Sequence, residues 1–179
     1  MKFLRHLITI TRHRHAVIRN AFRAGIFLQA LRHDLSKYSP TEFFAGVKYY
    51  ADGKRSPNER EREAHGYSRA WMHHKGRNRH HFEYWVDINP ETKNYEPVKM
   101  PLRYLAEMFC DRVAASEIYQ GKAYTNAHPL AYFDRGKAKN YMHPETAAHL
   151  RAWLVLLAEK GRREAFATVK KEIRAKKEY

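Results

Sequence analysis

Histidines are the unusual feature of this 179-residue sequence, and one of them directly precedes an aspartate. The 12 histidines fall in several separate places, so they do not form a tag. Histidine is the commonest metal ligand in proteins and the usual acid or base near neutral pH. The pair His33-Asp34 follows an apolar helical segment, Ile26–Leu31, and offers a nitrogen and an oxygen ligand together. The alternative is a basic protein that carries many histidines on its surface.

Another histidine lies on the apolar face of the first helix that the sequence predicts. At 3.6 residues per turn, His13 falls between Ile10 and Val17 on an apolar stripe, whereas His15 points to the opposite face. We therefore expect His13 to be turned inward, as a metal ligand or as a core histidine satisfied by a hydrogen bond. The stripe consists of Phe3, Leu7, Ile10, Val17, Ala21 and Ala24.

An aspartate occupies a similar position in the helix predicted over Met100–Tyr119. This segment is apolar on two sides, which is typical of a buried helix, and Asp111 lies in the middle of one apolar face. A buried carboxylate must be paired, hydrogen-bonded or bound to a metal, because leaving it bare is costly. Asp111 is therefore a candidate metal ligand, and the alternative is an ion pair with Arg103 or Arg112.

Four histidines gather within nine residues between two tryptophans. They are His73, His74, His80 and His81. Such a cluster favours a metal site over a solvated run of charges. If the helix continues past Gly76, His74 and His81 share one face, and His73 and His80 lie on an adjoining face. Because Gly76 leaves the geometry open, the sequence does not decide which of these histidines face inward.

The elements that must position these residues are almost all helices. Glycine and proline number only 8 and 7, and alternating strand-like runs are scarce. The segment Ser39-Pro40-Thr41-Glu42 predicts a helix start with a capping box, in which the Ser39 hydroxyl and the Glu42 carboxylate satisfy backbone donors. Polar loops are expected over residues 52–60, 87–101 and 121–144.

The sequence predicts an all-α fold with a single domain, a helical bundle over residues 1–160. The length is that of one ordinary domain of roughly 100–200 residues. The hydrophobic fraction of 44% excludes a disordered protein despite the charge. The residues after Gly161 form a basic amphipathic pattern, so we expect residues 161–179 to be a C-terminal helical tail.

Charge and composition narrow the class of partner. The chain carries 34 Lys and Arg against 19 Asp and Glu, a formal net charge of +15, which fits a phosphate-bearing small molecule or a nucleic acid. The single cysteine, Cys110, excludes a disulfide framework and a cysteine-rich zinc finger. No apolar run is long enough to span a membrane, and the N-terminus is a poor signal peptide. We therefore expect a cytoplasmic protein without a membrane partner.

In their order along the chain, the candidate ligands resemble those of the HD-domain superfamily, which consists largely of all-helical metal-dependent phosphohydrolases. The superfamily has a histidine, a His-Asp pair, often two or three more histidines and a final aspartate. The matching positions here are His13, His33-Asp34, the cluster from His73 to His81, and Asp111. The stretch HDLSK resembles the HD motif followed by a lysine, which places Lys37 as the phosphate-binding lysine.

A closer resemblance covers most of the chain, from His13 to Leu150. The segments HDLSKYSPTEF, AWMHHKGRNRHHFEYW, MPLRYLAEMFCDR and HPET are similar to a family of small bacterial and phage proteins with a domain of unknown function. That family supplies no established activity, so the expected chemistry comes from the HD-domain resemblance.

The HD-domain resemblance implies a metal centre with nitrogen and oxygen ligands. Such ligands suit Mn, Fe, Co, Ni or Zn, bound as one ion or as two ions bridged by Asp34. Typical HD hydrolases space their later histidines more widely than this chain does, so the resemblance does not choose among them. The candidate metal ligands are His13, His33, Asp34, His74, His80, His81 and Asp111.

The same resemblance implies roles in a phosphoester hydrolysis. Asp34 and Lys37 would take part in catalysis, Asn78 would hold a leaving group or a water, and Glu107 or Glu83 would orient a ligand histidine. The basic residues that would offset charge on the phosphate oxygens are Lys37, Arg77 and Arg79.

The sequence thus favours a metal-dependent phosphohydrolase that acts on a nucleotide or another phosphate ester through a metal-activated water. Two alternatives stay open. Some proteins of the same fold are two-iron oxygenases with much of the same ligand set. A non-catalytic nucleic-acid-binding protein, with or without a structural metal, would also explain the basic charge. The sequence does not indicate an oligomeric state.

Overall fold

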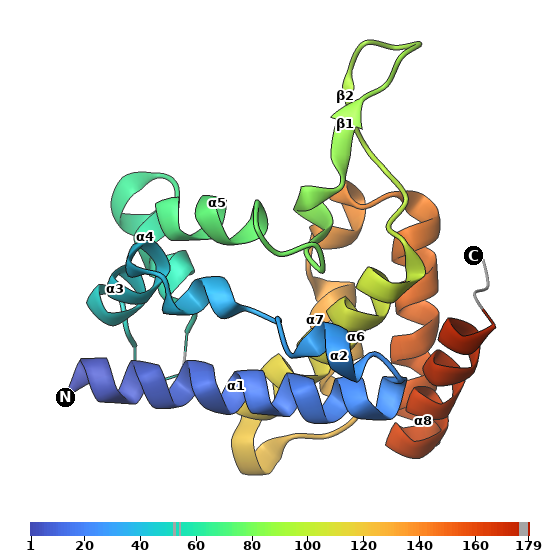
Figure 1. The fold of residues 1–179 in the computed structure, drawn as a ribbon, viewed down its shortest axis with the longest axis horizontal. Helices are drawn as coiled ribbons and strands as arrows, with labels where there is room; N and C mark the ends of the chain where they lie inside the picture. The colour runs from blue at the N-terminus through green and yellow to red at the C-terminus, as the bar shows by residue number, and fades with distance from the viewer. Residues whose placement is uncertain (52, 54, 176–178) are drawn as a thin grey trace.

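Helices make up most of the structure, a computed structural model that describes residues 1–179 except 52, 54 and 176–178 (Figure 1). The described residues pack as one helical domain, which confirms the all-α expectation. The α-helices are α1 (Lys2–Ala24), α2 (Phe27–Ala30), α3 (Pro40–Lys48), α4 (Pro57–His65), α5 (Arg69–Lys75), α6 (Leu102–Gln120), α7 (His128–Arg135) and α8 (Pro144–Arg174).

Short 3-10 helices and one hairpin complete the described chain. The 3-10 helices are η1 (Leu35–Tyr38), η2 (Phe82–Tyr84), η3 (Gly121–Ala123) and η4 (Ala138–Tyr141). The strands β1 (Val86–Ile88) and β2 (Tyr95–Pro97) pair antiparallel, with Asp87 opposite Glu96. The hairpin projects away from the helices at the top of Figure 1.

The main core lies where α1, α6 and α8 pack against one another. Leu105, Phe109 and Val113 on α6 are fully buried. The rings of Phe109 and Trp153 meet nearly edge to face, with centroids 5.8 Å apart. Burial of these large apolar side chains is the dominant stabilising contribution to such a core. The long helices therefore form a rigid frame on which polar side chains of α1 and α6 can be aimed.

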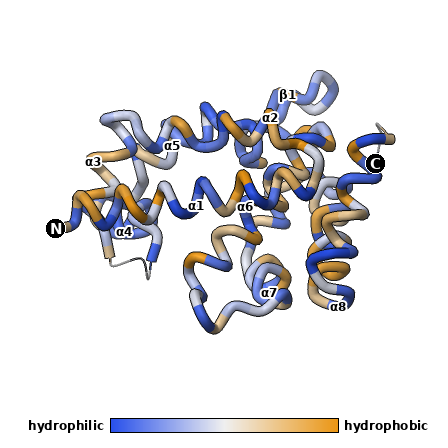
Figure 2. The backbone as a smooth tube through the Cα atoms, turned by 60° about the horizontal axis from the view of Figure 1, so that its bottom comes forward, coloured by the Kyte–Doolittle hydropathy of each residue, from blue (hydrophilic) through white to orange (hydrophobic). Residues whose placement is uncertain are grey.

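Helix α1 shows alternating hydrophobic and hydrophilic stretches along its length (Figure 2). Ile10 and Val17 are buried, His13 is buried between them, and His15 is exposed. The helix ends at Gly25, which adopts a left-handed conformation with φ 80° and donates its N–H to a carbonyl of the last turn. The prediction that His13 faces inward is confirmed.

Helix α3 begins at Pro40 as predicted, but the capping box does not form. The Ser39 hydroxyl makes no cap hydrogen bond, so that part of the prediction is wrong. The Glu42 carboxylate contacts the rings of His73 and His74 on α5 instead. Glu42 lies on the buried face of α3, where a carboxylate must find hydrogen-bond partners within the protein. The backbone N–H groups at the start of the helix can instead be satisfied by water.

The segments predicted as loops contain short elements. Helix α4 starts at Pro57, and α7 starts with His128-Pro129, so these prolines mark first turns rather than breaks. The hairpin lies within residues 87–101 and just before them. Helix α5 ends at Lys75 and is followed by Gly76, so the helical face imagined across the histidine cluster is interrupted there.

Helix α8 is divided by a non-helical residue, Gly161, with φ 81° and ψ 176°. The residues after it are not detached from the core, because Ala165, Phe166 and Val169 are buried in it. Residues 176–178 of the predicted tail lie outside the described residues. A separate tail over 161–179 stays a prediction. None of the described helices combines the length and the apolar character needed to cross a bilayer.

Candidate metal centre

Asp34 lies in the turn between α2 and η1, in a backbone conformation that is uncommon outside glycine. Its φ of 52° and ψ of 25° are left-handed, a region that aspartate visits more readily than bulkier residues. The turn buries the carboxylate, whose side chain is 1% exposed. Within the described part of the chain, neither carboxylate oxygen accepts a hydrogen bond of ordinary geometry.

One group of possible ligands joins this turn to the two long core helices. His13 comes from α1, His33 and Asp34 from the turn, and Asp111 from α6. Asp111 Oδ1 lies 2.9 Å from His13 Nε2 and 3.7 Å from His33 Nε2. Asp34 Oδ2 lies 3.2 Å from His33 Nε2 and 3.8 Å from His13 Nε2. These four residues, which are far apart in the sequence, therefore lie together in the structure.

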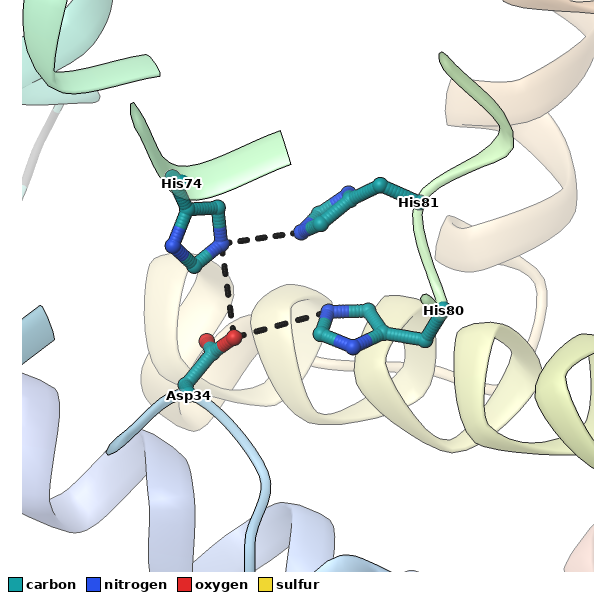
Figure 3. A group of neighbouring side chains, drawn as sticks. All are labelled: Asp34, His74, His80 and His81. Atoms are coloured by element: carbon teal, nitrogen blue, oxygen red, sulfur yellow. Dashed lines mark hydrogen bonds and ion pairs between the residues drawn. The ribbon is translucent and has the colours of Figure 1, made fainter. Parts of the chain in front are cut away.

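A second group lies on the other side of the Asp34 carboxylate (Figure 3). The rings of His74, at the end of α5, and His80, in the loop after it, point toward Asp34, and the ring of His81 points toward His74. His74 Nε2 and His80 Nε2 lie 3.3 and 3.5 Å from Asp34 Oδ1. His81 Nε2 lies 2.9 Å from His74 Nε2. Oδ1 therefore faces this group, and Oδ2 faces the first group.

These spacings are those expected between ligands of a shared ion. Two ligand atoms at about 2.1 Å from an ion lie about 3.0–3.4 Å apart at octahedral or tetrahedral angles. Among the described residues, the Nε2 atoms of His13, His33 and His80 are buried and make no hydrogen bond of ordinary geometry, although carboxylate oxygens lie 2.9, 3.2 and 3.5 Å from them. Because buried polar atoms are normally satisfied, the convergence of these nitrogens on Asp34 with poor hydrogen-bond geometry fits a site for a metal ion. The donor set fits a metal ion in each group.

Glu107 on α6 holds two of these rings from behind. Its Oε1 lies 2.9 Å from His33 Nδ1 and 3.4 Å from His80 Nδ1. Its Oε2 accepts a hydrogen bond of 2.5 Å from Gln29 Nε2. A carboxylate on Nδ1 fixes the tautomer and the orientation of a ring whose Nε2 is a ligand. The expectation that Glu107 or Glu83 orients a histidine is therefore met by the position of Glu107.

Glu42 holds the other side of the centre. Its two oxygens lie 2.7 Å from His74 Nδ1 and 2.7 Å from His73 Nδ1. The Ser36 hydroxyl lies 3.2 Å from His74 Nδ1, and Asn78 Nδ2 donates to that hydroxyl at 2.8 Å. His74 is thus fixed by a carboxylate, a hydroxyl and an amide, and the ring of His73 is turned to Glu42 rather than to Asp34.

Opposed charges keep the carboxylates of the centre ionised. Burial alone would raise the pKa of Asp34, but the His33 ring and the Lys37 ammonium hold it well below its usual value. Lys37 Nζ lies 2.6 Å from Asp34 Oδ2. Burial is also outweighed at Glu107, where hydrogen bonds from His33 and His80 lower the pKa to about 2. Ionised carboxylates are the form that binds a cation.

The histidines differ in how readily they would give up a proton. Burial lowers the pKa of His81, and the neighbouring His80 lowers it further, so the ring is neutral as a metal ligand must be. Burial also lowers the pKa of His33, but Asp34 and Glu107 outweigh it and raise the pKa to about 10. An ion that binds His33 Nε2 must therefore displace a proton from this ring.

Comparison with known proteins identifies one matching family. Residues 2–155 match a family of unknown function, DUF5662. The chain belongs to this family. No curated protein and no solved structure matches the chain. Membership in DUF5662 therefore covers most of the chain, including all the residues of both ligand groups, but carries no activity with it.

The structure of this DUF5662 chain brings most of the sequence-predicted site residues together. Its two groups contain all seven candidate ligands, His13, His33, Asp34, His74, His80, His81 and Asp111. Lys37 lies beside them. Asn78 is next to His74 and donates to the carbonyl of that residue at 2.8 Å.

Two predicted phosphate-binding residues lie apart from the groups. The exposed Arg77 donates to the carbonyl of His73, at the surface end of α5. The exposed Arg79 donates to Tyr104 and lies over the Tyr84 ring, 5.7 Å from its centroid. The described contacts of both guanidinium groups are therefore with the edge of the site and not with the ligands.

Sequence reasoning missed three supports of the centre in this DUF5662 chain. Glu42 carried a capping-box signal, which concealed its contact with α5. Ser36 and Gln29 carried no periodic signal, because each acts through side-chain hydrogen bonds to residues that are distant in the sequence. The one usable signal for Glu42 was its position on the apolar face of α3, where a carboxylate is out of place.

Proposed function

We propose that this protein is a metal-dependent phosphohydrolase that cleaves a nucleotide or another phosphate ester. The observation that carries the proposal is the position of Asp34, whose two oxygens face two separate groups of histidine and carboxylate ligands. A carboxylate shared in this way is suited to bridge two ions. The order of the ligands along the chain, which resembles that of HD-domain phosphohydrolases, supports the same reading.

The ligand chemistry favours a divalent transition metal. Imidazole nitrogens outnumber carboxylate oxygens, which suits Mn, Fe, Co, Ni or Zn better than Ca or Mg. A pair of such ions about 3.5–4 Å apart supplies an activated water and a clamp for a phosphoryl oxygen. Glu107 and Glu42 would keep the ligand rings aimed inward while substrate is bound.

The substrate would approach from the side of Lys37 and Asp111. Their side chains are 29% and 18% exposed, whereas those of Asp34 and His33 are at most 1% exposed. A phosphoryl group entering there meets the Lys37 ammonium, which would offset charge on its oxygens. The net charge of +15 draws polyanionic substrates toward the protein as a whole. In this proposal Asn78 positions His74 through Ser36 rather than touching the leaving group.

The first experiment is elemental analysis of the purified, untagged protein together with two matched variants. We expect one or two transition-metal ions per chain in the wild type and a loss of metal in His13→Ala. His15→Ala removes an exposed histidine from the opposite face of the same helix and should retain the metal. A wild type that takes up no metal on reconstitution would refute the metal centre.

The second experiment tests the reaction. The metal-loaded protein is offered nucleotides and simple phosphate esters, and we expect released phosphate with the wild type and none with Asp34→Ala. Hydrolysis that persists in a folded Asp34→Ala variant contradicts the proposal. Iron in the wild type, with oxygen consumption in place of phosphate release, would support a two-iron oxygenase on the same ligands.

A further inference from the structure

A groove outside the metal centre lies between α2, the start of α6 and the end of α8. Its volume of about 940 Å³ is at the upper end of the range of about 300–1,000 Å³ for small-molecule sites. The floor is apolar, because Met100 and Ile26 are 1% and 7% exposed there. The walls include Phe27, Leu28 and Leu102.

One wall of the groove is formed by a strongly exposed apolar residue. Leu28 is 78% exposed, and its neighbour Phe27 is 40% exposed. Together with the apolar floor, these two side chains make one side of the groove continuously apolar. The short helix α2 presents both residues to this side, while Ala30 on the same helix is buried in the core.

The charged residues of the groove have one sign. Lys99 and Arg103 lie at its rim, and no acidic side chain is among the described residues that line it. Lys99 pairs with the exposed Glu145, and a surface pair of this kind contributes little. Arg103 Nε donates to Gln29 Oε1 at 2.7 Å, which fixes the guanidinium at the rim.

Both polar atoms of the Gln29 side chain are already hydrogen-bonded, so Lys99 and Arg103 are the groups at the rim that would contact an anion. Its Oε1 is used by Arg103, and its Nε2 donates to Glu107 Oε2. A second copy of this chain is a poor occupant, because a formal charge of +15 on each copy and two cations at the rim oppose self-association. The lining of the groove therefore favours a ligand that has an apolar body and a negatively charged group at one end.

We propose that this groove binds an amphiphilic anion, an alkyl or aryl chain that carries a single carboxylate, sulfonate or phosphate group. The chain covers Leu28, Met100 and Leu102, and the anionic group sits between Lys99 and Arg103. The groove contains none of the candidate metal ligands and meets the centre only at Gln29, so the proposal does not depend on the proposed function.

The test uses the full-length protein and anilinonaphthalene sulfonate, an aromatic anion that fluoresces in apolar sites. We expect saturable binding of one equivalent per chain. Decanoate, below its micellar range, should displace the probe, whereas decyltrimethylammonium at equal concentration should not, because its charge opposes Lys99 and Arg103. Equal displacement by the cation, or none by decanoate, would overturn the proposal.

Two variants locate the site. Lys99→Glu reverses a partly exposed charge and should weaken binding of the probe and of decanoate about tenfold. Leu28→Gln removes apolar contact at an exposed position and should also weaken binding. The matched control, Lys122→Glu, reverses an exposed charge beyond the opposite end of α6 and should bind as the wild type does. Wild-type affinity in both groove variants, with folding checked by circular dichroism, places the ligand elsewhere and refutes the assignment.

Discussion

Two buried glutamates keep the rings of the candidate metal centre in place. Glu107 reaches two histidines from α6, and Glu42 reaches His74 from α3. A carboxylate on Nδ1 leaves Nε2 as the ligand atom and increases its basicity. The second oxygen of Glu107 accepts from Gln29, so the carboxylate itself has little freedom to turn. The affinity of the site for a metal ion would therefore depend in part on residues that do not contact the ion.

The substitution Glu107→Gln tests this support. A glutamine must face Gln29 Nε2 with either its oxygen or its own amide, so it cannot reproduce all three contacts at once. We expect metal affinity to fall about 10–100-fold, as measured by competition with a chromogenic chelator. Glu164→Gln, at an exposed position on α8, serves as the control. Unchanged affinity in Glu107→Gln would show that this carboxylate does not hold the ligands.

Helix α3, which presents Glu42 to α5, also crosses α1 closely. A Cβ atom placed on Gly46 would lie 2.1 Å from His6 Nε2, closer than atoms can approach. The ring of His6 is buried against Phe43, and burial, aided by Lys37, lowers its pKa to about 4. The glycine therefore sets the distance between the helix that carries His13 and the helix that carries Glu42.

The substitution Gly46→Ala should force these two helices apart. We expect a loss of about 1–3 kcal/mol in the free energy of unfolding, measured in urea. In a His6→Ala background the ring is gone, so Gly46→Ala should then cost little. An equal cost in both backgrounds would show that the contact with His6 is not the cause.

Sequence patterns revealed the parts of the site that regular helices carry. The stripe on α1 places His13 inside, and the apolar faces of α6 place Asp111 where a carboxylate needs a partner. The choice among the four clustered histidines could not be made, because α5 ends before Gly76 and the loop that follows has no periodicity. The hairpin was missed because its strands of three residues each are too short to show alternation, and α7 was missed because its first turn contains a proline.

On the scale of the whole molecule, the centre joins segments that are distant in sequence. Its ligands come from α1, from the turn after α2, from α5 with its loop, and from α6. An ion in either group would join at least two of these segments, so it would stabilise the folded chain and not the unfolded one. The buried carboxylates also repel one another less when a cation lies between them.

Removal of the metal should therefore lower the melting temperature. At a free-metal concentration 100 times the Kd, binding adds about 2.7 kcal/mol, which corresponds to about 5–10 °C for a domain of this size. Calorimetry before and after dialysis against a chelator measures the shift. An Asp34→Ala variant, which loses the ligand shared by both groups, should melt at the same temperature in both conditions. A wild type that is indifferent to the chelator would contradict the stabilising role.

The two ligand groups around Asp34 differ in what anchors them, and this difference has a kinetic consequence. His13 and Asp111 stand on the long core helices, whereas His80 and His81 stand on the irregular segment between α5 and η2, which no regular helix holds in place. Two ions would then leave at different rates, the loop-side ion first and the helix-side ion only as the core loosens. We expect biphasic release to a chelator, and preparations with close to one ion per chain after long purification.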